Sequence, residues 1–198
     1  MRSIRLLATL LLLCALSCTQ PPDPNKTIPV FLLKFSRNYF AHPIGEYDHV
    51  TEKNDWRDAW YNAQDFGENR HLGEDWNKVT GGDTDCGEAV YATADGEIVF
   101  AADAGPGWGN VIVIEHSADD GTKVRSLYGH LETIAKTSGP VKRREQIGTI
   151  GSAKGRYRCH LHFEMRWSEC PLWNEPGPGY SDDRHGWIDP TEFIEKSR

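Results

Sequence analysis

Five side chains that can bind a metal ion or carry a proton lie in three short motifs of this 198-residue chain. The motifs are HLGED, YGHL and HLHFE, and the residues are His71, Asp75, His130, His160 and His162. Imidazole and carboxylate groups are ordinary zinc ligands, and three protein ligands leave the fourth position of a tetrahedral ion open, as in catalytic zinc sites. The sequence therefore predicts a zinc site that does chemistry.

The two histidines of the HLHFE motif are expected to have different roles. Side chains alternate along a strand, so His160 and His162 project to the same side, about 7 Å apart. Zinc–nitrogen bonds are only about 2.0–2.1 Å long, so the two rings do not easily share one ion. We expect one ring to bind the metal and the other to stand beside it. Glu164 lies on the same face of the predicted strand as the two histidines. It is either a hydrogen-bond partner of a ligand imidazole or an ordinary strand-end carboxylate.

The HLGED motif places a glycine between two potential ligands. A turn at Gly73 can bring the side chains of His71 and Asp75 to one ion. Taken alone, such a pair commonly lies in a solvated turn, and a single histidine such as His130 is most often a surface residue. The joint occurrence of the three motifs favours a metal site.

The motifs HLGED, DGEIVFA, GNVIVIEH, YGHL, IGTIGS and HLHFE, with the closing WIDPTEF, occur in an order that resembles lysostaphin-type (LytM-domain) zinc endopeptidases. These enzymes cut peptidoglycan cross-links. The resemblance covers about residues 71–193. It implies a mainly β, single-domain fold, an antiparallel sheet or sandwich of the duplicated hybrid motif type with few short helices. The usual glycine-rich approach to HLHFE is replaced here by Arg156, Tyr157, Arg158 and Cys159, which changes one wall of the expected groove.

The resemblance also implies a role for each site residue. His71, Asp75 and His162 would hold one Zn²⁺ per chain, and His130 and His160 would be catalytic. Bound zinc lowers the pKa of water toward about 7 and polarises a carbonyl group. The two catalytic imidazoles would position or deprotonate that water and stabilise the oxyanion, and either could protonate the departing amine.

We consider three candidate functions for this sequence. The first is an endopeptidase acting on the peptide stems of peptidoglycan, cutting either a D-alanine–diaminopimelate bond or a glycine bridge. The second is a catalytically silent LytM-like module that activates a cell wall amidase, for which missing zinc ligands are expected. The third is a binding module with a structural zinc, which conflicts with an open coordination position. We expect a monomer.

The N-terminal residues indicate export. Residues 1–17 combine two arginines with a short apolar run, which is typical of a signal peptide. The sequence before Cys18 resembles a lipobox, which would place an acylated cysteine in a membrane, although an ordinary cleavage site also fits. A Pro-rich tether (18–30) and a flanking segment (31–66) then precede the peptidase domain (67–195). The expected location is the periplasm or cell envelope.

The charge balance argues against nucleic acid as a partner. The chain has a net charge of −7, which becomes −9 when residues 1–17 and their two arginines are removed. Arg156 and Arg158 are candidates for local attraction of acidic stem peptides, or they belong to a solvated turn.

The cysteines that remain after export predict a disulfide in an oxidising compartment. A bridge between Cys159 and Cys170 is awkward because the strand between them extends over about 20 Å and only three residues return. Cys86 would pair with one of these two cysteines.

Four short runs rich in Val and Ile predict strands at 97–101, 110–116, 123–130 and 160–167. Asp120-Gly121 favours a hairpin between the second and third run. His130 is then predicted at the far end of its strand, where a groove could open. The segment 173–187 is rich in Gly, Pro and Asp and is interpreted as a loop that could line the cleft.

Overall fold

The computed structural model describes residues 40–45, 59–118, 121–168 and 175–197. The predicted signal peptide, the tether with Cys18, and Cys170 lie outside these residues. In the described ranges, no helix combines the length and apolar character needed to cross a membrane.

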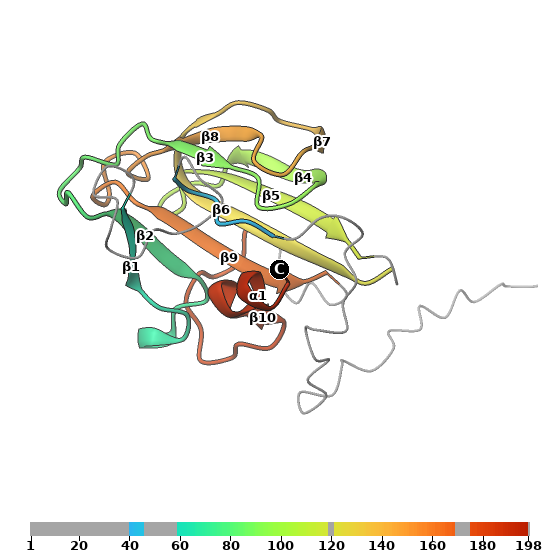
Figure 1. The fold of residues 1–198 in the computed structure, drawn as a ribbon. Coiled ribbons are helices and arrows are strands. Elements are labelled where there is room, and N and C mark those ends of the chain that lie inside the picture. The colour runs from blue at the N-terminus through green and yellow to red at the C-terminus, as the bar shows by residue number, and fades with distance from the viewer. Residues whose placement is uncertain (1–39, 46–58, 119–120, 169–174, 198) are drawn as a thin grey trace, which may run out of the picture.

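The described chain is mainly antiparallel β-structure, as predicted (Figure 1). Its elements are β1 (Trp60–Gln64), the 3₁₀ helix η2 (Glu68–Arg70), β2 (Glu74–Lys78), β3 (Ala89–Tyr91), β4 (Gly96–Asp103), β5 (Asn110–Ser117), β6 (Lys123–Ile134), β7 (Gly139–Val141), β8 (Gln146–Ile150), β9 (Leu161–Trp167), β10 (Trp187–Ile188) and α1 (Pro190–Lys196). The strands follow the order β1-β2-β9-β6-β5-β4-β7, while β3 pairs with β8, β8 with β6, and β10 with β9.

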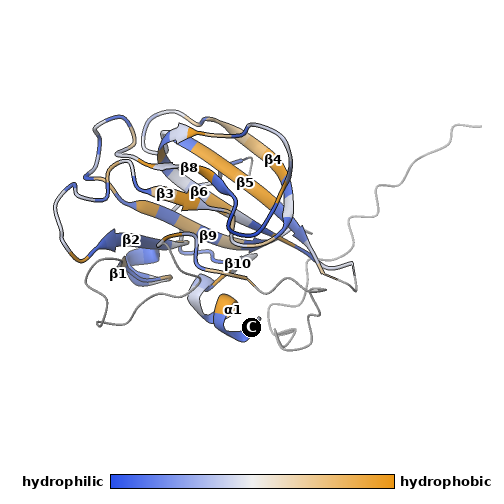
Figure 2. Cartoon of the chain, turned by 45° about the horizontal axis from the view of Figure 1, so that its top comes forward, coloured by the Kyte–Doolittle hydropathy of each residue, from blue (hydrophilic) through white to orange (hydrophobic). Residues whose placement is uncertain are grey.

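Alternation along β9 separates the core from the site. Leu161, Phe163 and Met165 are fully buried in the main hydrophobic core, together with residues of β3, β5, β6, β8 and α1. The intervening residues His162, Glu164 and Arg166 face the opposite side of the strand. Figure 2 shows β5 as largely hydrophobic and β2 as hydrophilic. Strand β9 therefore carries a core face and a polar face.

The predicted hairpin is confirmed. Strands β5 and β6 pair antiparallel, with Val113 opposite Leu127. Gly121 lies in the connection with φ +85°, a conformation that glycine adopts without steric cost. This hairpin forms the centre of the sheet.

The prediction that His130 ends its strand is wrong. Strand β6 continues to Ile134 because its last residues pair with β8, including Leu131 opposite Ile150. His130 interrupts this long strand locally, because its φ is +63°. The sequence run predicted only the part of β6 that pairs with β5 and β9.

The described part of the flanking segment packs two aromatic residues into the core. Phe40 and Trp60 are both buried in the main core cluster. Arg144 donates hydrogen bonds to the carbonyl oxygens of His42 and Ile44, at 3.0 and 3.2 Å. The described part of this segment thus contributes to the same core as the strands of the peptidase domain.

Cys86 is bonded to Cys159, with 5.2 Å between the Cα atoms. Of the two partners considered for Cys86, this is the one adjacent to HLHFE. The bridge joins the loop after β2 to the residue immediately before His160. It therefore anchors one end of the motif.

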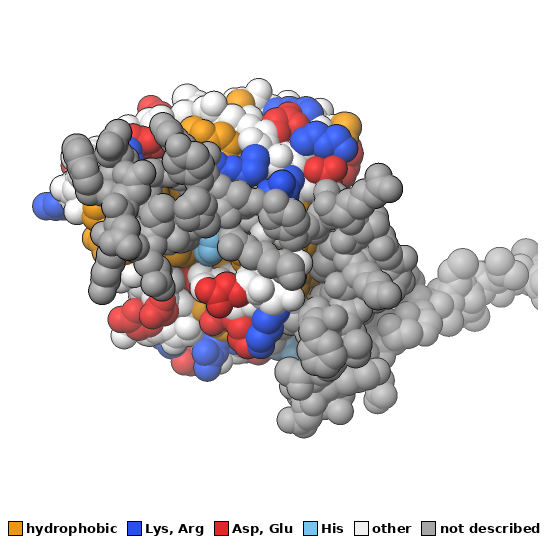
Figure 3. Space-filling view, in the orientation of Figure 1, with side chains coloured by type: hydrophobic (Ala, Val, Ile, Leu, Met, Phe, Trp, Pro, Cys, Tyr) orange, Lys and Arg blue, Asp and Glu red, His pale blue; other side chains and the backbone are white. Residues whose placement is uncertain are grey.

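Charged side chains of both signs lie next to one another on the face seen in Figure 3. Ion pairs in the described structure include Lys123 with Glu115, at 2.6 Å, and Lys142 with Asp95, at 2.8 Å. Exposed pairs of this kind contribute little to stability, so the fold depends mainly on its apolar core.

Candidate metal and catalytic site

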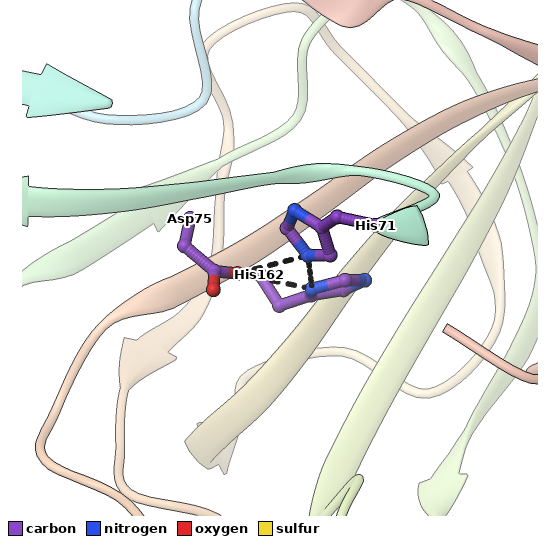
Figure 4. A group of neighbouring side chains, drawn as sticks. All are labelled: His71, Asp75 and His162. Atoms are coloured by element: carbon purple, nitrogen blue, oxygen red, sulfur yellow. Dashed lines mark hydrogen bonds and ion pairs between the residues drawn. The ribbon is translucent and has the colours of Figure 1, made fainter. Parts of the chain in front are cut away.

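Three potential ligands come from two adjacent strands and the turn before one of them. Asp75 on β2 lies directly opposite His162 on β9 in the strand register. His71 precedes β2, and its backbone forms an isolated bridge with Tyr180. Figure 4 shows the side chains of His71, Asp75 and His162 converging on one point. The HLGED and HLHFE motifs therefore meet because β2 pairs with β9.

The glycine in HLGED is required by this pairing. A Cβ atom on Gly73 would lie 2.5 Å from the carbonyl oxygen of Phe163 and 2.9 Å from Cγ of Glu164. Both separations are too short for a real contact, so only glycine lets the bend before β2 lie this close to β9.

The donor atoms have separations that suit one small cation. His71 Nε2 lies 2.9 Å from His162 Nδ1 and 3.3 Å from Asp75 Oδ1. His162 Nδ1 and Asp75 Oδ1 are 3.1 Å apart. Two atoms that each lie about 2.0–2.1 Å from a tetrahedral zinc ion are about 3.3 Å apart. The triangle is a few tenths of an ångström tighter than this value, and two imidazoles with a carboxylate are a common zinc donor set. These residues fit a zinc ion.

The triad is buried on one side and open on the other. His71 is fully buried and His162 is 2% exposed. The side chains of Asp75 and His160 are each 15% exposed. A substrate would therefore approach from the side of Asp75 and His160.

The two flanking histidines have the same orientation relative to the backbone. Nδ1 of His130 lies 3.1 Å from the carbonyl oxygen of Trp108, and Nδ1 of His160 lies 2.8 Å from that of Arg158. A carbonyl oxygen only accepts, so each Nδ1 carries the hydrogen and each Nε2 is left as the acceptor in a neutral ring. Nε2 of His160 lies 3.7 Å from Oδ1 of Asp75. The two predicted catalytic rings thus lie beside the triad.

Burial and neighbouring charges shift the pKa values of these groups. Burial alone would raise the pKa of Asp75, but hydrogen bonds from His162 and His71 outweigh it and hold the pKa well below its usual range. Burial, followed by the charges of nearby His162 and His160, lowers the pKa of His130 to about 3. At neutral pH, His130 is therefore an uncharged imidazole and Asp75 a carboxylate.

Trp108 is a site residue that the sequence analysis missed. Its carbonyl oxygen accepts hydrogen bonds from both the backbone nitrogen and the ring of His130. Its indole packs edge-on against His162 with 5.2 Å between ring centroids, and donates a hydrogen bond to the carbonyl oxygen of Gly177. The left-handed backbone of His130 is strained for a residue with a side chain, and these contacts hold it. Trp108 lies among Gly105, Gly107 and Gly109, outside every motif that predicted the site.

Two tyrosines form the rim of the site. Tyr180 stacks on His71 with ring centroids 4.9 Å apart, and Tyr157 lies 5.1 Å from the ring of His130. Both are substantially exposed, at 48% and 43%. Burial, followed by the charge of Asp75, raises the pKa of Tyr180 to about 12, so its phenol keeps its proton. Neither tyrosine lies in a metal-ligand motif, although the loop 173–187, which contains Tyr180, was predicted to reach the cleft.

The buried Nδ1 of His71 has no hydrogen-bond partner among the described residues. Its ring is instead held by the stack with Tyr180 and by the contact with His162, whose centroid is 4.8 Å away. Packing, rather than a second hydrogen bond, thus orients this potential ligand.

Comparison with known proteins agrees with the fold and the motifs. The profile of peptidase family M23 matches residues 70–173, and the chain belongs to this family. The murein hydrolase activator NlpD of Escherichia coli K12 is 40% identical over 82 residues, which cover 41% of this chain and 20% of NlpD. The DD-carboxypeptidase/endopeptidase Mpg of Neisseria meningitidis serogroup B is 37% identical over 86 residues, covering 43% of this chain and 19% of Mpg. The chain thus spans about a fifth of the length of these relatives.

The fold is also found in a solved structure of the SpoIIQ-SpoIIIAH pore forming complex. The match has a TM-score of 0.51 and 21% identity, and it covers 82% of this chain and 94% of the other. At this identity the likeness concerns the fold alone.

Proposed function

We propose that this protein is a zinc-dependent metalloendopeptidase that hydrolyses peptide cross-links of bacterial peptidoglycan. The observation that carries the proposal is the convergence of five side chains. Donor atoms of His71, Asp75 and His162 all lie within 4.8 Å of one another, and the rings of His130 and His160 are 4.7 Å apart beside them. Membership of peptidase family M23 supports the reaction class.

The proposed ligands are Nε2 of His71, Oδ1 of Asp75 and Nδ1 of His162. These three atoms face each other, while the remaining ring nitrogen of His162 is engaged by Glu164 at 3.0 Å. When bound, zinc supplies a Lewis acid that polarises the scissile carbonyl and acidifies water. The low pKa of Asp75 keeps its oxygen available as a negatively charged ligand at neutral pH.

His130 and His160 would handle protons at Nε2. Each ring is held through Nδ1 by a backbone carbonyl, so Nε2 can accept a proton from water or hydrogen-bond to the reacting group. A ring that has accepted a proton can return it to the departing amine. Positioned groups of this kind typically accelerate a reaction about 10²- to 10⁴-fold.

Substrate binding would involve the segment before His160. Arg156, Tyr157 and Arg158 are all exposed, and Tyr157 also contacts the ring of His130. Peptidoglycan stems carry carboxylates, which the two guanidinium groups would attract. With its predicted signal peptide and lipobox-like Cys18, the enzyme would act in the cell envelope.

The second candidate is an activator of another wall hydrolase, which is favoured by the similarity to the murein hydrolase activator NlpD. The two candidates differ in what the purified chain does alone. An endopeptidase loaded with zinc releases fragments from purified sacculi, whereas an activator releases none until an amidase is added. Fragment analysis with and without added amidase separates the two.

A further inference from the structure

Glu164 is a fully buried carboxylate that lies directly behind the proposed zinc site. It shares a face of β9 with His162, since alternate residues of a strand point the same way. Its Oε1 lies 3.0 Å from Nε2 of His162, the ring nitrogen turned away from Asp75. One carboxylate therefore contacts the ligand imidazole from the side opposite to the triad.

A second donor holds the carboxylate itself. Nε1 of Trp187 donates a hydrogen bond of 2.8 Å to Oε2 of Glu164. Trp187 begins β10, which pairs with β9. Each oxygen of Glu164 thus has its own N–H donor, one from the ligand ring and one from the WIDPTEF motif.

This arrangement selects one nitrogen of His162 for the metal. A carboxylate offers only acceptors, so Nε2 of His162 must carry the hydrogen. With Nε2 engaged by Glu164, the nitrogen left for a cation is Nδ1, which donates to Asp75 when no metal is bound and lies 2.9 Å from Nε2 of His71 and 3.1 Å from Oδ1 of Asp75. When the ring gives up one hydrogen to a bound metal, Glu164 keeps the other on Nε2; without Glu164, the neutral ring could keep its hydrogen on Nδ1, toward Asp75, where it would occupy the place of the metal.

We propose that Glu164, held by Trp187, is a positioning residue that fixes the ring of His162 with Nδ1 as the metal-binding atom. The inference rests on the proposed function, because it concerns the same zinc site. Partners of this kind behind a metal ligand typically affect metal affinity by about 10- to 100-fold when they are removed.

The number of acceptors gives a sharp test. Glu164→Gln keeps the size of the side chain but replaces one acceptor oxygen with an NH₂ group, which is a donor. This NH₂ group must face the N–H of either His162 or Trp187, so one of the two hydrogen bonds is lost. In the double variant Glu164→Gln, Trp187→Phe, the competing indole donor is absent. The remaining amide oxygen can then turn to His162 and restore its hydrogen bond.

The measurement is the zinc dissociation constant of the full chain, by chelator competition at one pH. We expect Glu164→Gln to bind zinc about 10- to 100-fold more weakly than the wild type. Trp187→Phe alone should weaken zinc binding less than Glu164→Gln does. The double variant should recover most of the zinc affinity that Glu164→Gln loses. ¹⁵N NMR of the zinc-loaded wild type should show the metal on Nδ1 and the hydrogen on Nε2 of His162. Thermal unfolding of the metal-free variants identifies any that do not fold.

Two results would overturn the inference. One is wild-type affinity in a folded Glu164→Gln variant, and the other is a folded double variant that binds no better than Glu164→Gln. Digestion of sacculi by the wild type decides the proposed function separately. A wild type that holds zinc but releases no fragments refutes the endopeptidase and leaves the affinity comparison valid, whereas a wild type that takes up no zinc refutes both.

Discussion

Asp75 and His162 lie directly opposite each other on β2 and β9, with Oδ1 and Nδ1 3.1 Å apart, although 87 residues separate them in the chain. The ladder hydrogen bonds of the two strands fix their backbones, so the side chains meet without a flexible loop between them. A metal site supported by two paired strands is geometrically well defined.

The five site residues should separate into two groups when each is replaced by alanine. His162→Ala removes a metal-binding atom, so stoichiometric zinc and peptidoglycan digestion should both be lost. His160→Ala should keep zinc and lower turnover by about 10²- to 10⁴-fold, since its ring lies beside the triad. Metal analysis and fragment release from sacculi measure the two effects. Loss of zinc in His160→Ala would contradict the division of roles.

Gly73→Ala should damage the zinc site through backbone contact. The new Cβ atom would collide with the carbonyl oxygen of Phe163 and with Glu164, so the bend before β2 must move away from β9. We expect a loss of stability of about 1–3 kcal/mol together with weaker zinc binding. Gly121→Ala is the matched control, because its Cβ would meet no atom within 4 Å.

The control also carries a positive φ of +85°, so Gly121→Ala should cost about 1–2 kcal/mol. Its zinc affinity should nevertheless stay at the wild-type value, because the hairpin turn is not part of the site. Equal zinc affinities in the two variants would show that close approach at Gly73 is unimportant for the metal.

Removing the disulfide should lower stability. The bridge between Cys86 and Cys159 closes a loop of 73 residues, and loop-closure entropy for this length is worth roughly 4 kcal/mol. The double variant Cys86→Ser, Cys159→Ser should therefore unfold at lower denaturant concentration than the oxidised wild type. Under reducing conditions the difference should largely disappear. A difference that persists in strong reductant would point to packing of the sulfur atoms instead.

Stability should fall in acid because of His116. Burial lowers its pKa to about 4, while its ring contacts the carbonyl oxygen of Asp95 and the hydroxyl of Ser126. In the unfolded chain the ring of His116 becomes protonated below about pH 6.5, whereas in the folded chain it stays neutral until about pH 4. As the pH falls from about 6.5 to about 4, the free energy of unfolding should therefore decrease by roughly 3 kcal/mol.

The variant His116→Gln removes this titration. We expect its free energy of unfolding to depend less on pH between 6.5 and 4 than that of the wild type, although its stability at pH 7 is lower. Denaturant unfolding at several pH values measures both slopes. Parallel pH curves for the two proteins would contradict the assigned pKa.

Local signals in the sequence predicted four strands, one hairpin and a metal site, whereas the antiparallel fold and the grouping of all five site residues came from the resemblance to LytM-domain peptidases. The sequence did not predict the left-handed backbone of His130 or the continuation of β6 to Ile134, which depend on Trp108 and on pairing with β8. The second hydrogen bond of Glu164 also needed the structure, since Trp187 is 23 residues away. The rim tyrosines, Tyr157 and Tyr180, belong to segments without a periodic pattern.

The most direct test of the central claim is the digestion of purified sacculi of known cross-link chemistry, with the fragments identified by mass. The account predicts that the zinc-loaded wild type converts cross-linked muropeptides to monomers, and that the metal-free protein and His160→Ala do not. Cross-linked muropeptides that remain intact with the zinc-loaded wild type would contradict it.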